Sequence, residues 1–499
     1  MADATPPGSV SRRTVIGGLT AAAALAGTGR AAAQRAEPGR RPNVLLVVVD
    51  DMRFDEYGGG GHPYLTTPNI DRLAREGVSF RNMFHATPLC SPNRASILTG
   101  EYSSRHGIYS NVSRAQLSHR LRTVTGHLRA AGYQTAHVGK WHMGDDPRPR
   151  PGYDYWVSFP AQGKILDPEL WEEGGLHRVE GYVTDILTDR AARFLDNRDR
   201  SRPFFLYLGH KAIHPDIIQR NDGSIAPGEG SPYIAAPRHA GRYARALFRR
   251  APTAIGAIDA RPKSRMVEHF LRLQAEPAIQ REFASMIDPG VSEDTIRARA
   301  EMMLSVDDGL GVLLDSLARS GDLDDTVVIF TSDNGFFFGE HGLSIERRLP
   351  YEEAIRMPVL LRYPPLAAQG GSVAALGSSI DIAPTIVDLT GAPVPAHMQG
   401  RSLKPVLGGA RPEAGRSAVL VEHYAHDLPM PWMLDADYRC IRTRRHKYIH
   451  WTQYPERGEL YDLAADPHET QNLCERAPRL AAAMRRQLGV LVNQSLGLA

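Results

Sequence analysis

An unbroken aliphatic run that ends in two carboxylates is the strongest constraint on the fold of this chain. Residues 43–49 read NVLLVVV, and Asp50 and Asp51 follow directly. A run of β-branched and aliphatic residues without polar alternation is typical of a strand buried on both faces of a parallel sheet. Two adjacent carboxylates after such a strand are costly unless a cation or hydrogen-bond donors lie between them. The sequence therefore predicts a buried sheet with a polar site at one edge.

Similar apolar runs recur along the chain and alternate with helical patterns. The further strands are expected at 204–208, 327–330 and 359–361. Helical patterns lie between and around them, at 68–76, 92–99, 123–131, 183–196, 295–319 and 381–391. Alternation of strands and helices predicts a doubly wound α/β domain, whose functional loops gather at the carboxyl ends of the strands.

The 499 residues are enough for one large domain and a smaller one. We expect a linker at 34–41, a main domain at 42–408 and a smaller C-terminal domain at 409–499. The C-terminal part contains short strand patterns around 418–422, 438–442 and 447–451, followed by a helical pattern near 477–493. These patterns predict a small α+β domain with a short antiparallel sheet and one helix.

Residues 216–292 differ in composition from the rest of the main domain. They are rich in glycine, proline and arginine, with five arginines close together at Arg238, Arg242, Arg245, Arg249 and Arg250. We interpret the segment as an insertion over the mouth of a substrate site. Two interpretations of its arginines remain open, namely anion recognition and a solvated basic face.

The N-terminus resembles an export signal. Arg12 and Arg13 lie in the sequence SRRTVI, an apolar stretch follows at 15–27, and small residues at 31–33 offer a cleavage site. We expect 1–33 to be a twin-arginine signal peptide, recognised by the twin-arginine translocase, and the mature protein to be periplasmic or secreted. The apolar stretch is too short and interrupted for stable membrane insertion. The alternative is a disordered, alanine-rich leader.

Charge and cysteine content exclude some classes of protein. The net charge of +3 is too small to indicate nucleic-acid binding. Three cysteines, Cys90, Cys440 and Cys474, do not make a disulfide framework. The sequence leaves open whether Cys440 and Cys474 pair after export, because it does not show how close together they lie.

A second strand also ends in oxygen-bearing side chains. After the apolar residues 327–330, the chain continues Thr331-Ser332-Asp333-Asn334-Gly335. Together with Asp50 and Asp51, Asp333 and Asn334 would offer a hard divalent cation, Ca²⁺ or Mg²⁺, the oxygen ligands that it prefers. Taken singly, each pair could equally be a helix cap and a turn.

Cys90 opens the run CSPNRASILTG. Pro92 suits the first turn of a helix, where its missing N–H costs little, so the helix at 92–99 would have Cys90 at its N-terminal end. Free N–H groups and the helix dipole stabilise an anion there, and Arg94, one turn in, could point its guanidinium at the same anion. The alternative is a buried structural cysteine beside a turn.

A cysteine with proline at +2 and arginine at +4 resembles the signature of the formylglycine-dependent sulfatases of the alkaline phosphatase superfamily. The resemblance implies a large mixed sheet flanked by helices. It also implies that a maturation enzyme oxidises Cys90 to formylglycine (3-oxoalanine), whose hydrate attacks the sulfur of a sulfate ester. In this family pattern the divalent cation is bound by Asp50, Asp51, Cys90, Asp333 and Asn334.

Two further motifs match the cationic shell of that family. In GKWHMG, Lys140 would balance negative charge and bind sulfate, and His142 would deprotonate the hydroxyl that does not attack. An exposed strand edge is the alternative for this motif. In GHKAIHP, His214 would contact the sulfate or the leaving oxygen and serve as general acid, with His210 and Lys211 of less certain role.

The fourth motif departs from the family pattern. Relatives usually carry a sulfate-binding lysine shortly after the Gly-Leu of GEHGL, but this chain has Arg347 and Arg348. We assign sulfate binding to Arg347 and leave Arg348 as the alternative. Arginine clamps a sulfate with two donors but does not protonate a leaving group, so the acid role falls more heavily on His214.

The resemblance covers nearly the whole chain after residue 41. It implies hydrolysis of a carbohydrate or aryl sulfate ester to an alcohol and inorganic sulfate. Two alternatives remain: a phosphonate monoester or phosphodiester hydrolase of the same superfamily, and a non-catalytic anion-binding protein in which Cys90 is unmodified. The sequence does not specify the alcohol, the choice of Ca²⁺ or Mg²⁺, or the oligomeric state.

Overall fold

The computed structural model describes residues 41–112, 115–219, 225–226, 233–254, 264–283, 291–344, 347–367, 370–408, 415–425 and 430–498. The expected signal peptide at 1–33 and the linker up to residue 40 lie outside the described residues. Within the described residues, no helix combines the length and apolar character needed to cross a membrane.

A ten-stranded mixed sheet forms the centre of the molecule, in the order β12-β2-β11-β10-β1-β7-β3-β4-β5-β6. Its strands are β1 (Asn43–Val49), β2 (Val78–Phe84), β3 (Gln134–Gly139), β4 (Tyr155–Ser158), β5 (Glu169–Glu172), β6 (Gly175–Arg178), β7 (Phe204–Gly209), β10 (Thr326–Ser332), β11 (Val359–Arg362) and β12 (Gly371–Ser378). The strands β10, β1, β7, β3 and β4 run parallel, and β11 is antiparallel to both of its neighbours.

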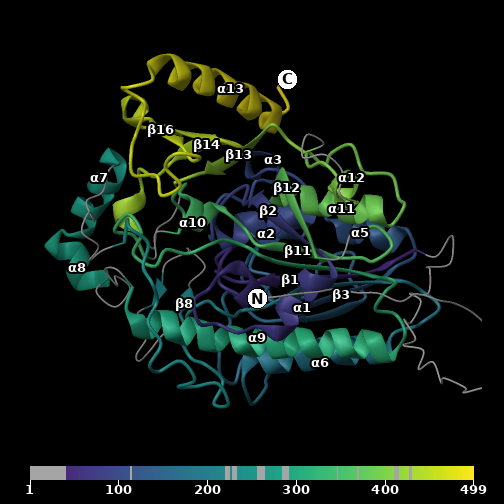
Figure 1. Ribbon diagram of the computed structural model, residues 1–499. Coiled ribbons are helices and arrows are strands. Elements are labelled where there is room, and N and C mark those ends of the chain that lie inside the picture. Colours follow the sequence, from purple (N-terminus) through teal and green to yellow (C-terminus); the bar gives the residue numbers. More distant parts are fainter. Residues whose placement is uncertain are drawn as a thin grey trace, which may run out of the picture.

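Helices cover both faces of this sheet (Figure 1). The longer ones, of seven or more residues, are α1 (Pro68–Glu76), α2 (Cys90–Thr99), α5 (Val124–Ala130), α6 (Val183–Asn197), α7 (Arg265–Gln274), α8 (Pro277–Phe283), α9 (Glu293–Arg319) and α11 (Ile382–Leu389). The short ones, of four residues, are α3 (Ser103–His106), α4 (Ala115–Ser118), α10 (Glu352–Ile355) and α12 (Lys404–Leu407), with 3₁₀ turns at Gly58–Gly60, Ser379–Asp381, Pro431–Met433 and Pro455–Arg457.

The apolar run of β1 is buried because each of its faces packs against a different helical layer. Leu45, Val47 and Val49 lie in a core with side chains of α1, α6 and α9. Val44, Leu46 and Val48 lie in a second core with side chains of α2, α5 and α11. Successive side chains of a strand point to opposite faces, so a continuous aliphatic run is what a doubly covered strand requires.

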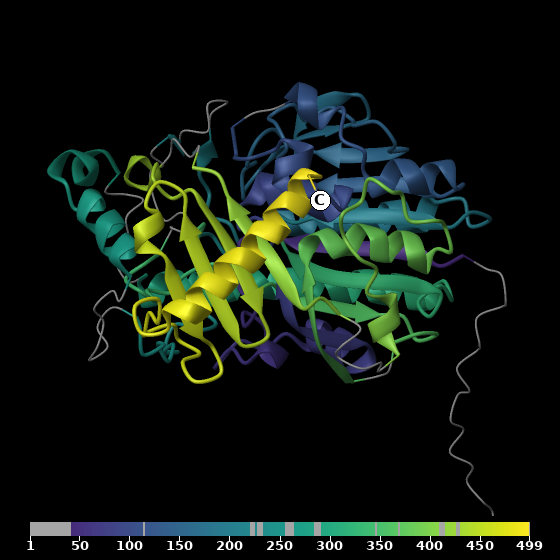
Figure 2. The same ribbon diagram turned by 90° about the horizontal axis from the view of Figure 1, so that it is seen from above.

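The C-terminal part forms a separate four-stranded antiparallel sheet. Its strands are β13 (Ala418–His423), β14 (Tyr438–Thr443), β15 (His446–Trp451) and β16 (Glu459–Asp462), paired in chain order. Helix α13 (Pro478–Leu496) crosses this sheet, as Figure 2 shows, and buries Met484 and Leu488 against it. The expectation of a mixed α/β sheet with a smaller α+β part is therefore confirmed.

The segment 216–292 is described only in pieces, including the hairpin of β8 (Ile218–Gln219) and β9 (Ile225–Ala226). Two of its five clustered arginines contact other parts of the described chain. Arg238 forms ion pairs with Asp185 and Asp308, and Arg250 donates to the carbonyl of Phe338. These contacts give the two arginines a structural role, and the placement of the segment over a substrate mouth stays a prediction.

Candidate active site

The two carboxylate-bearing strand ends meet at one edge of the sheet. β1 and β10 are parallel neighbours whose last residues, Val49 and Ser332, lie in register. The N–H of Asp333 donates to the carbonyl of Val49 at 3.1 Å, so the next residues of both strands leave the sheet together. Asp50, Asp51, Asp333 and Asn334 are all fully buried. The predicted oxygen cluster is therefore present, although its side chains come from positions 282 residues apart.

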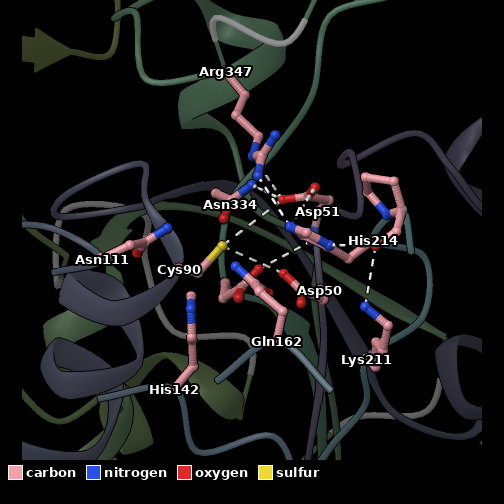
Figure 3. A network of polar contacts seen from close by, with 12 residues as sticks. Asp50, Asp51, Cys90, Asn111, His142, Gln162, Lys211, His214, Asn334 and Arg347 are labelled. Atoms are coloured by element: carbon pink, nitrogen blue, oxygen red, sulfur yellow. Dashed lines mark hydrogen bonds and ion pairs between the residues drawn. The ribbon is translucent and has the colours of Figure 1, made fainter. Parts of the chain in front are cut away.

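Cys90 lies against this cluster. Its Sγ is 3.5 Å from Oδ1 of Asp50 and 4.0 Å from Oδ1 of Asp51 (Figure 3). Leu89 is extended and Cys90 is the first residue of α2, so the side chain projects from the helix N-terminus as the proline at position 92 predicts. Every residue of α2 is buried, which fixes Cys90 in this position.

Two residues of α2 tie the helix to the end of β10. Asn93 donates from Nδ2 to the carbonyl of Asp333 at 2.7 Å, and Arg94 donates from Nε to Oδ2 of Asp333 at 2.8 Å. Arg94 also donates from Nη1 to the carbonyl of Lys140 and to the hydroxyl of Tyr207, each at 3.1 Å. Its Nη2 lies 3.9 Å from Asp50. Arg94 therefore holds the carboxylate of Asp333 and the residue that follows β3, beside the place where the sequence predicts a bound anion.

Lys140 and His142 follow β3 and reach the same site. The N–H of Lys140 donates to the carbonyl of Gly209 at 2.7 Å, and its Nζ contacts Asp50 and Oε1 of Gln162. The Nδ1 of His142 lies 3.3 Å from Oγ of Ser91. Asp51 and His142 both adopt positive φ, 58° and 59°. Such backbone strain in non-glycine residues concentrates at functional sites.

His214 lies beside Asp51, with Nε2 at 3.9 Å from Oδ2. Its Nδ1 lies 2.9 Å from the carbonyl of Pro215, which can only accept, so Nδ1 carries the proton. The Nε2 of the neutral ring then accepts from Nη2 of Arg347 at 3.2 Å. In this arrangement Nε2 holds no proton, so a general-acid role for His214 requires that the ring first gain one.

Arg347 enters the cluster from the loop after β10 (Figure 3). Its Nε lies 2.8 Å from Oδ1 of Asp51. Arg348 contacts Sδ of Met430 instead, and its carbonyl accepts from the hydroxyl of Tyr438. Of the two arginines, Arg347 is the one that reaches Asp51 and His214.

The buried oxygens fit a hard divalent cation. Oδ2 of Asp51 and Oδ1 of Asn334 have no hydrogen-bond partner within the described part of the chain, and both are buried. Oxygens of Asp50 and Asp51, the sulfur of Cys90 and a nitrogen of His214 lie within 4.8 Å of one another. Carboxylate and amide oxygens are the ligands of Ca²⁺ and Mg²⁺, so the donor set agrees with the expected cation site.

Burial and charge shape the titration of this cluster. Burial raises the pKa of the Cys90 thiol well above its ordinary value, and Asp50 raises it further. Burial lowers the pKa of His214, and Lys140, Lys211 and Arg347 add to that effect. Burial and Lys140 also lower the pKa of Lys211 to about 8. An unmodified Cys90 would therefore be a protonated thiol and a poor nucleophile.

Sequence reasoning missed several supporting residues. Gln162 contacts Lys140 from the loop after β4, and Asn111 accepts from the N–H of Ser91 at 3.1 Å. Arg299, on α9, donates from Nη2 to the carbonyl of Asp51 at 2.7 Å and pairs with Glu56. None of these residues belongs to a motif that marks it. Only Arg299 offered a signal in the sequence, because an arginine there interrupts an otherwise apolar face of the predicted helix.

All three cysteines are free thiols. Cys440 is buried in β14, and Cys474 is partly buried before α13. The structure gives no disulfide between them.

Comparison with known proteins identifies the family. A family model described as "Sulfatase" matches residues 42–392, and one described as "N-sulphoglucosamine sulphohydrolase, C-terminal" matches residues 339–494. An N-acetylglucosamine-6-O-sulfatase of Bacteroides thetaiotaomicron is 33% identical, over 88% of this chain and 84% of that protein. The multifunctional alkaline phosphatase superfamily protein PehA of Trinickia caryophylli is 30% identical, over 89% of this chain and 93% of its own.

A solved structure, in complex with its substrate D-glucosamine-2-N,6-O-disulfate, has the same fold. It is 29% identical to this chain, with a TM-score of 0.75 over 91% of this chain and 98% of the other. The family match covers the two strand ends, α2 and the loops that carry Lys140, His214 and Arg347. The chain therefore belongs to the sulfatase family and has its alkaline-phosphatase-like fold.

Proposed function

We propose that this sulfatase removes the 6-O-sulfate group from glucosamine or N-acetylglucosamine units, through a formylglycine formed from Cys90. The observation that carries the reaction is the position of Cys90, 3.5 Å from Asp50 at a buried helix N-terminus. The sugar is supported by two relatives. One acts on N-acetylglucosamine 6-O-sulfate by name, and the other binds a 6-O-sulfated glucosamine as its substrate.

The side chains around Cys90 suit a tetrahedral oxyanion. Lys140, Lys211 and Arg347 lie close enough to His214 to influence its pKa, so three cationic groups surround one neutral imidazole. Buried cations without bulk water stabilise charge on sulfuryl oxygens more strongly than exposed ones do. Arg347 can offer two donors to the sulfate once it leaves Asp51. We propose that Lys140, His214 and Arg347 bind the sulfate.

Two groups complete the proposed chemistry. A Ca²⁺ or Mg²⁺ held by Asp50, Asp51, Asp333 and Asn334 would supply positive charge, and hydrated formylglycine would supply a nucleophilic hydroxyl plus a second hydroxyl for sulfate release. The chain's own residues then orient the reactants. His142, whose Nδ1 lies 3.3 Å from Oγ of Ser91, is the base that we propose for the second hydroxyl. Arg94 keeps Asp333 and the end of β3 fixed during the reaction.

The experiment that tests this function compares three substrates. We expect N-acetylglucosamine 6-sulfate to release inorganic sulfate faster than an aryl sulfate and an aryl phosphonate at equal concentration. Cys90→Ser should abolish release, because a serine alcohol lacks the second hydroxyl that expels the sulfate. A faster reaction with the phosphonate would favour the phosphonate monoester hydrolase alternative. Full turnover by Cys90→Ser would contradict the formylglycine route.

We also propose export through the twin-arginine route, which the SRRTVI sequence with Arg12 and Arg13 supports. Replacement of both arginines by lysine should keep the protein in the cytoplasm, as fractionation of cells would show. Unchanged export of that variant would refute the proposal.

A further inference from the structure

A second buried cluster lies apart from the active site. His341 follows β10, Glu353 belongs to α10, and Glu469 lies in the turn between β16 and α13. One nitrogen of His341 and one oxygen of each glutamate lie within 4.8 Å of one another, and all three residues are buried. Two distant parts of the chain therefore converge on one point.

Two of these atoms have no partner in the protein. Nε2 of His341 and Oε2 of Glu353 lack a hydrogen-bond partner among the described residues, and they lie 3.9 Å apart. The side chain of His341 is 6% exposed and that of Glu353 is 10% exposed. Buried polar atoms are normally satisfied, so two unpartnered atoms close to the second carboxylate, that of Glu469, indicate a missing ligand.

The charges around the cluster do not balance. Arg53 pairs with Asp55 and Glu340 at 2.8 and 2.9 Å. Arg442 pairs with Glu352 at 3.0 Å, and Lys447 contacts both Glu352 and Glu469. Glu353 forms no ion pair with a lysine or arginine of the described chain. Arg356 lies beside the same carboxylates and lowers the pKa of Glu352. Five carboxylates thus face four cations, namely Asp55, Glu340, Glu352, Glu353 and Glu469 against Arg53, Arg356, Arg442 and Lys447.

The pKa of Glu353 is consistent with this shortage of cationic partners. Burial raises the pKa of Glu353 to about 8, and Glu340 and Glu469 add to the rise. A buried carboxylate without a counter-charge either stays protonated or binds a cation.

We propose that His341, Glu353 and Glu469 bind a divalent transition-metal ion of the zinc type. One imidazole nitrogen and two carboxylate oxygens are a common ligand set for Zn²⁺, and a water molecule completes a tetrahedron. Tetrahedral bonds of about 2.0–2.1 Å place ligand atoms roughly 3.3 Å apart, which small side-chain rotations can reach from the present positions. A cavity of about 310 Å³ lies beside Glu353, and its lining also includes Glu340, Glu352 and the arginines Arg53, Arg356 and Arg442.

The ion would join the C-terminal part to the loop that carries Arg347. His341 stacks on Tyr351 with ring centroids 4.3 Å apart, and the hydroxyl of Tyr351 donates to Glu459 of β16 at 2.9 Å. Arg347 lies between His341 and Tyr351 in the chain. The loop of Arg347 is therefore held before Arg347 by His341, which belongs to this cluster, and after it by Tyr351, which stacks on His341.

Zinc binding to purified protein tests the proposal. The protein is stripped with a chelator, saturated with Ca²⁺ and dialysed against Zn²⁺, and its metal content is measured by mass spectrometry. We expect one zinc per chain at this site. His341→Gln and Glu353→Gln should each weaken its binding at least roughly 100-fold, because each removes a ligand.

Two control variants separate this site from others. His137→Gln removes a buried histidine whose ring centroid lies 4.4 Å from that of Trp156 and 5.0 Å from that of Tyr207, and it should leave zinc binding unchanged. Asp51→Asn should remove only zinc that enters the active site beside Cys90. Zinc content that survives both His341→Gln and Glu353→Gln would overturn the proposal.

A measurement on wild-type protein alone keeps the proposal falsifiable if those variants fail to fold. Co²⁺ bound by one imidazole and two carboxylates in a tetrahedron gives visible absorption bands, and Zn²⁺ should raise the melting temperature of Ca²⁺-saturated protein. Absence of both the bands and the rise would overturn the proposal.

Discussion

Arg347 and Arg348 are adjacent in sequence but have different environments. Arg347 reaches Asp51 and His214, whereas Arg348 points to Met430. The sequence placed a sulfate-binding cation in this loop by resemblance, yet it left the choice between the two arginines open. A loop has no periodicity that assigns neighbouring side chains to faces, so only the folded chain distinguishes them.

Replacement of each arginine tests this assignment. Arg347→Ala should lower kcat/KM by about 10–100-fold, because a hydrogen bond to a charged group contributes about 1.5–3 kcal/mol. Arg348→Ala, the matched control, should keep kcat/KM within about threefold if its side chain does not touch substrate. Steady-state kinetics on N-acetylglucosamine 6-sulfate would measure both. A larger loss in Arg348→Ala than in Arg347→Ala would reverse the assignment.

At the scale of elements, the ends of β3 and β7 approach each other closely at two glycines. Gly139 has φ +103°, and a Cβ there would lie 2.1 Å from the carbonyl oxygen of Gly209. A Cβ on Gly209 would lie 2.5 Å from the carbonyl oxygen of Lys140. This contact sets the position from which Lys140 and His142 enter the site. The sequence contains both glycines in the motifs GKWHMG and GHKAIHP, but it does not reveal that they touch.

Gly139→Ala should therefore destabilise the protein. A left-handed backbone costs a non-glycine residue about 1–3 kcal/mol, and overpacking against backbone adds about 1–3 kcal/mol. The control is Gly126→Ala in α5, where a Cβ would meet nothing within 4 Å and should stabilise by about 0.5–1 kcal/mol. Denaturant unfolding would measure both free energies. Equal stability of Gly139→Ala and wild type would contradict the close contact.

Element type and order were predictable because the apolar periodicities are long and regular. The strand at 204–208 became β7 (Phe204–Gly209), and the helix at 295–319 became α9 (Glu293–Arg319). Six strands of the large sheet were not predicted, namely β2, β3, β4, β5, β6 and β12. Of these, β4, β5 and β6 have only four residues each, and such short strands carry little pattern. The order of pairing was also not predictable, because it depends on contacts between distant residues.

At the scale of the whole molecule, the proposed cation would link three segments that meet only in the folded state. Asp50 and Asp51 follow β1, Cys90 begins α2, and Asp333 follows β10. Chelation should therefore lower both activity and melting temperature, since like charges would face each other at close range. The expected loss of stability is about 4 kcal/mol if the cation normally stands at 1,000 times its Kd.

Calorimetry with and without EDTA, followed by addition of Ca²⁺ or Mg²⁺, would check this. We expect Ca²⁺ or Mg²⁺ to restore both the activity and the melting temperature. An unchanged melting temperature and full activity in EDTA would contradict a cation at this site.

The two sheets share buried contacts, so they should unfold together. Val419 and Trp451 of the C-terminal sheet lie in one core with Phe84, Phe337 and Tyr351 of the main domain. The N–H of Glu422 also donates to the carbonyl of Ala86 at 2.9 Å. A domain interface that is large and apolar opposes independent unfolding. The sequence predicted two domains from the chain length and from the strand and helix patterns of the C-terminal part, but it did not show how much core they share.

We therefore expect one cooperative transition in differential scanning calorimetry, with equal calorimetric and van't Hoff enthalpies. Two separated transitions, one for each sheet, would show that the parts are thermodynamically independent.

Cys90 is proposed to become the nucleophile after oxidation, and the mass of its peptide measures that oxidation most directly. Conversion of the CH₂SH side chain to CHO lowers the mass of the peptide containing residue 90 by about 18 Da. Protein from its native host that releases sulfate should show this loss. A fully active preparation whose Cys90 peptide retains the unmodified thiol mass would contradict the account.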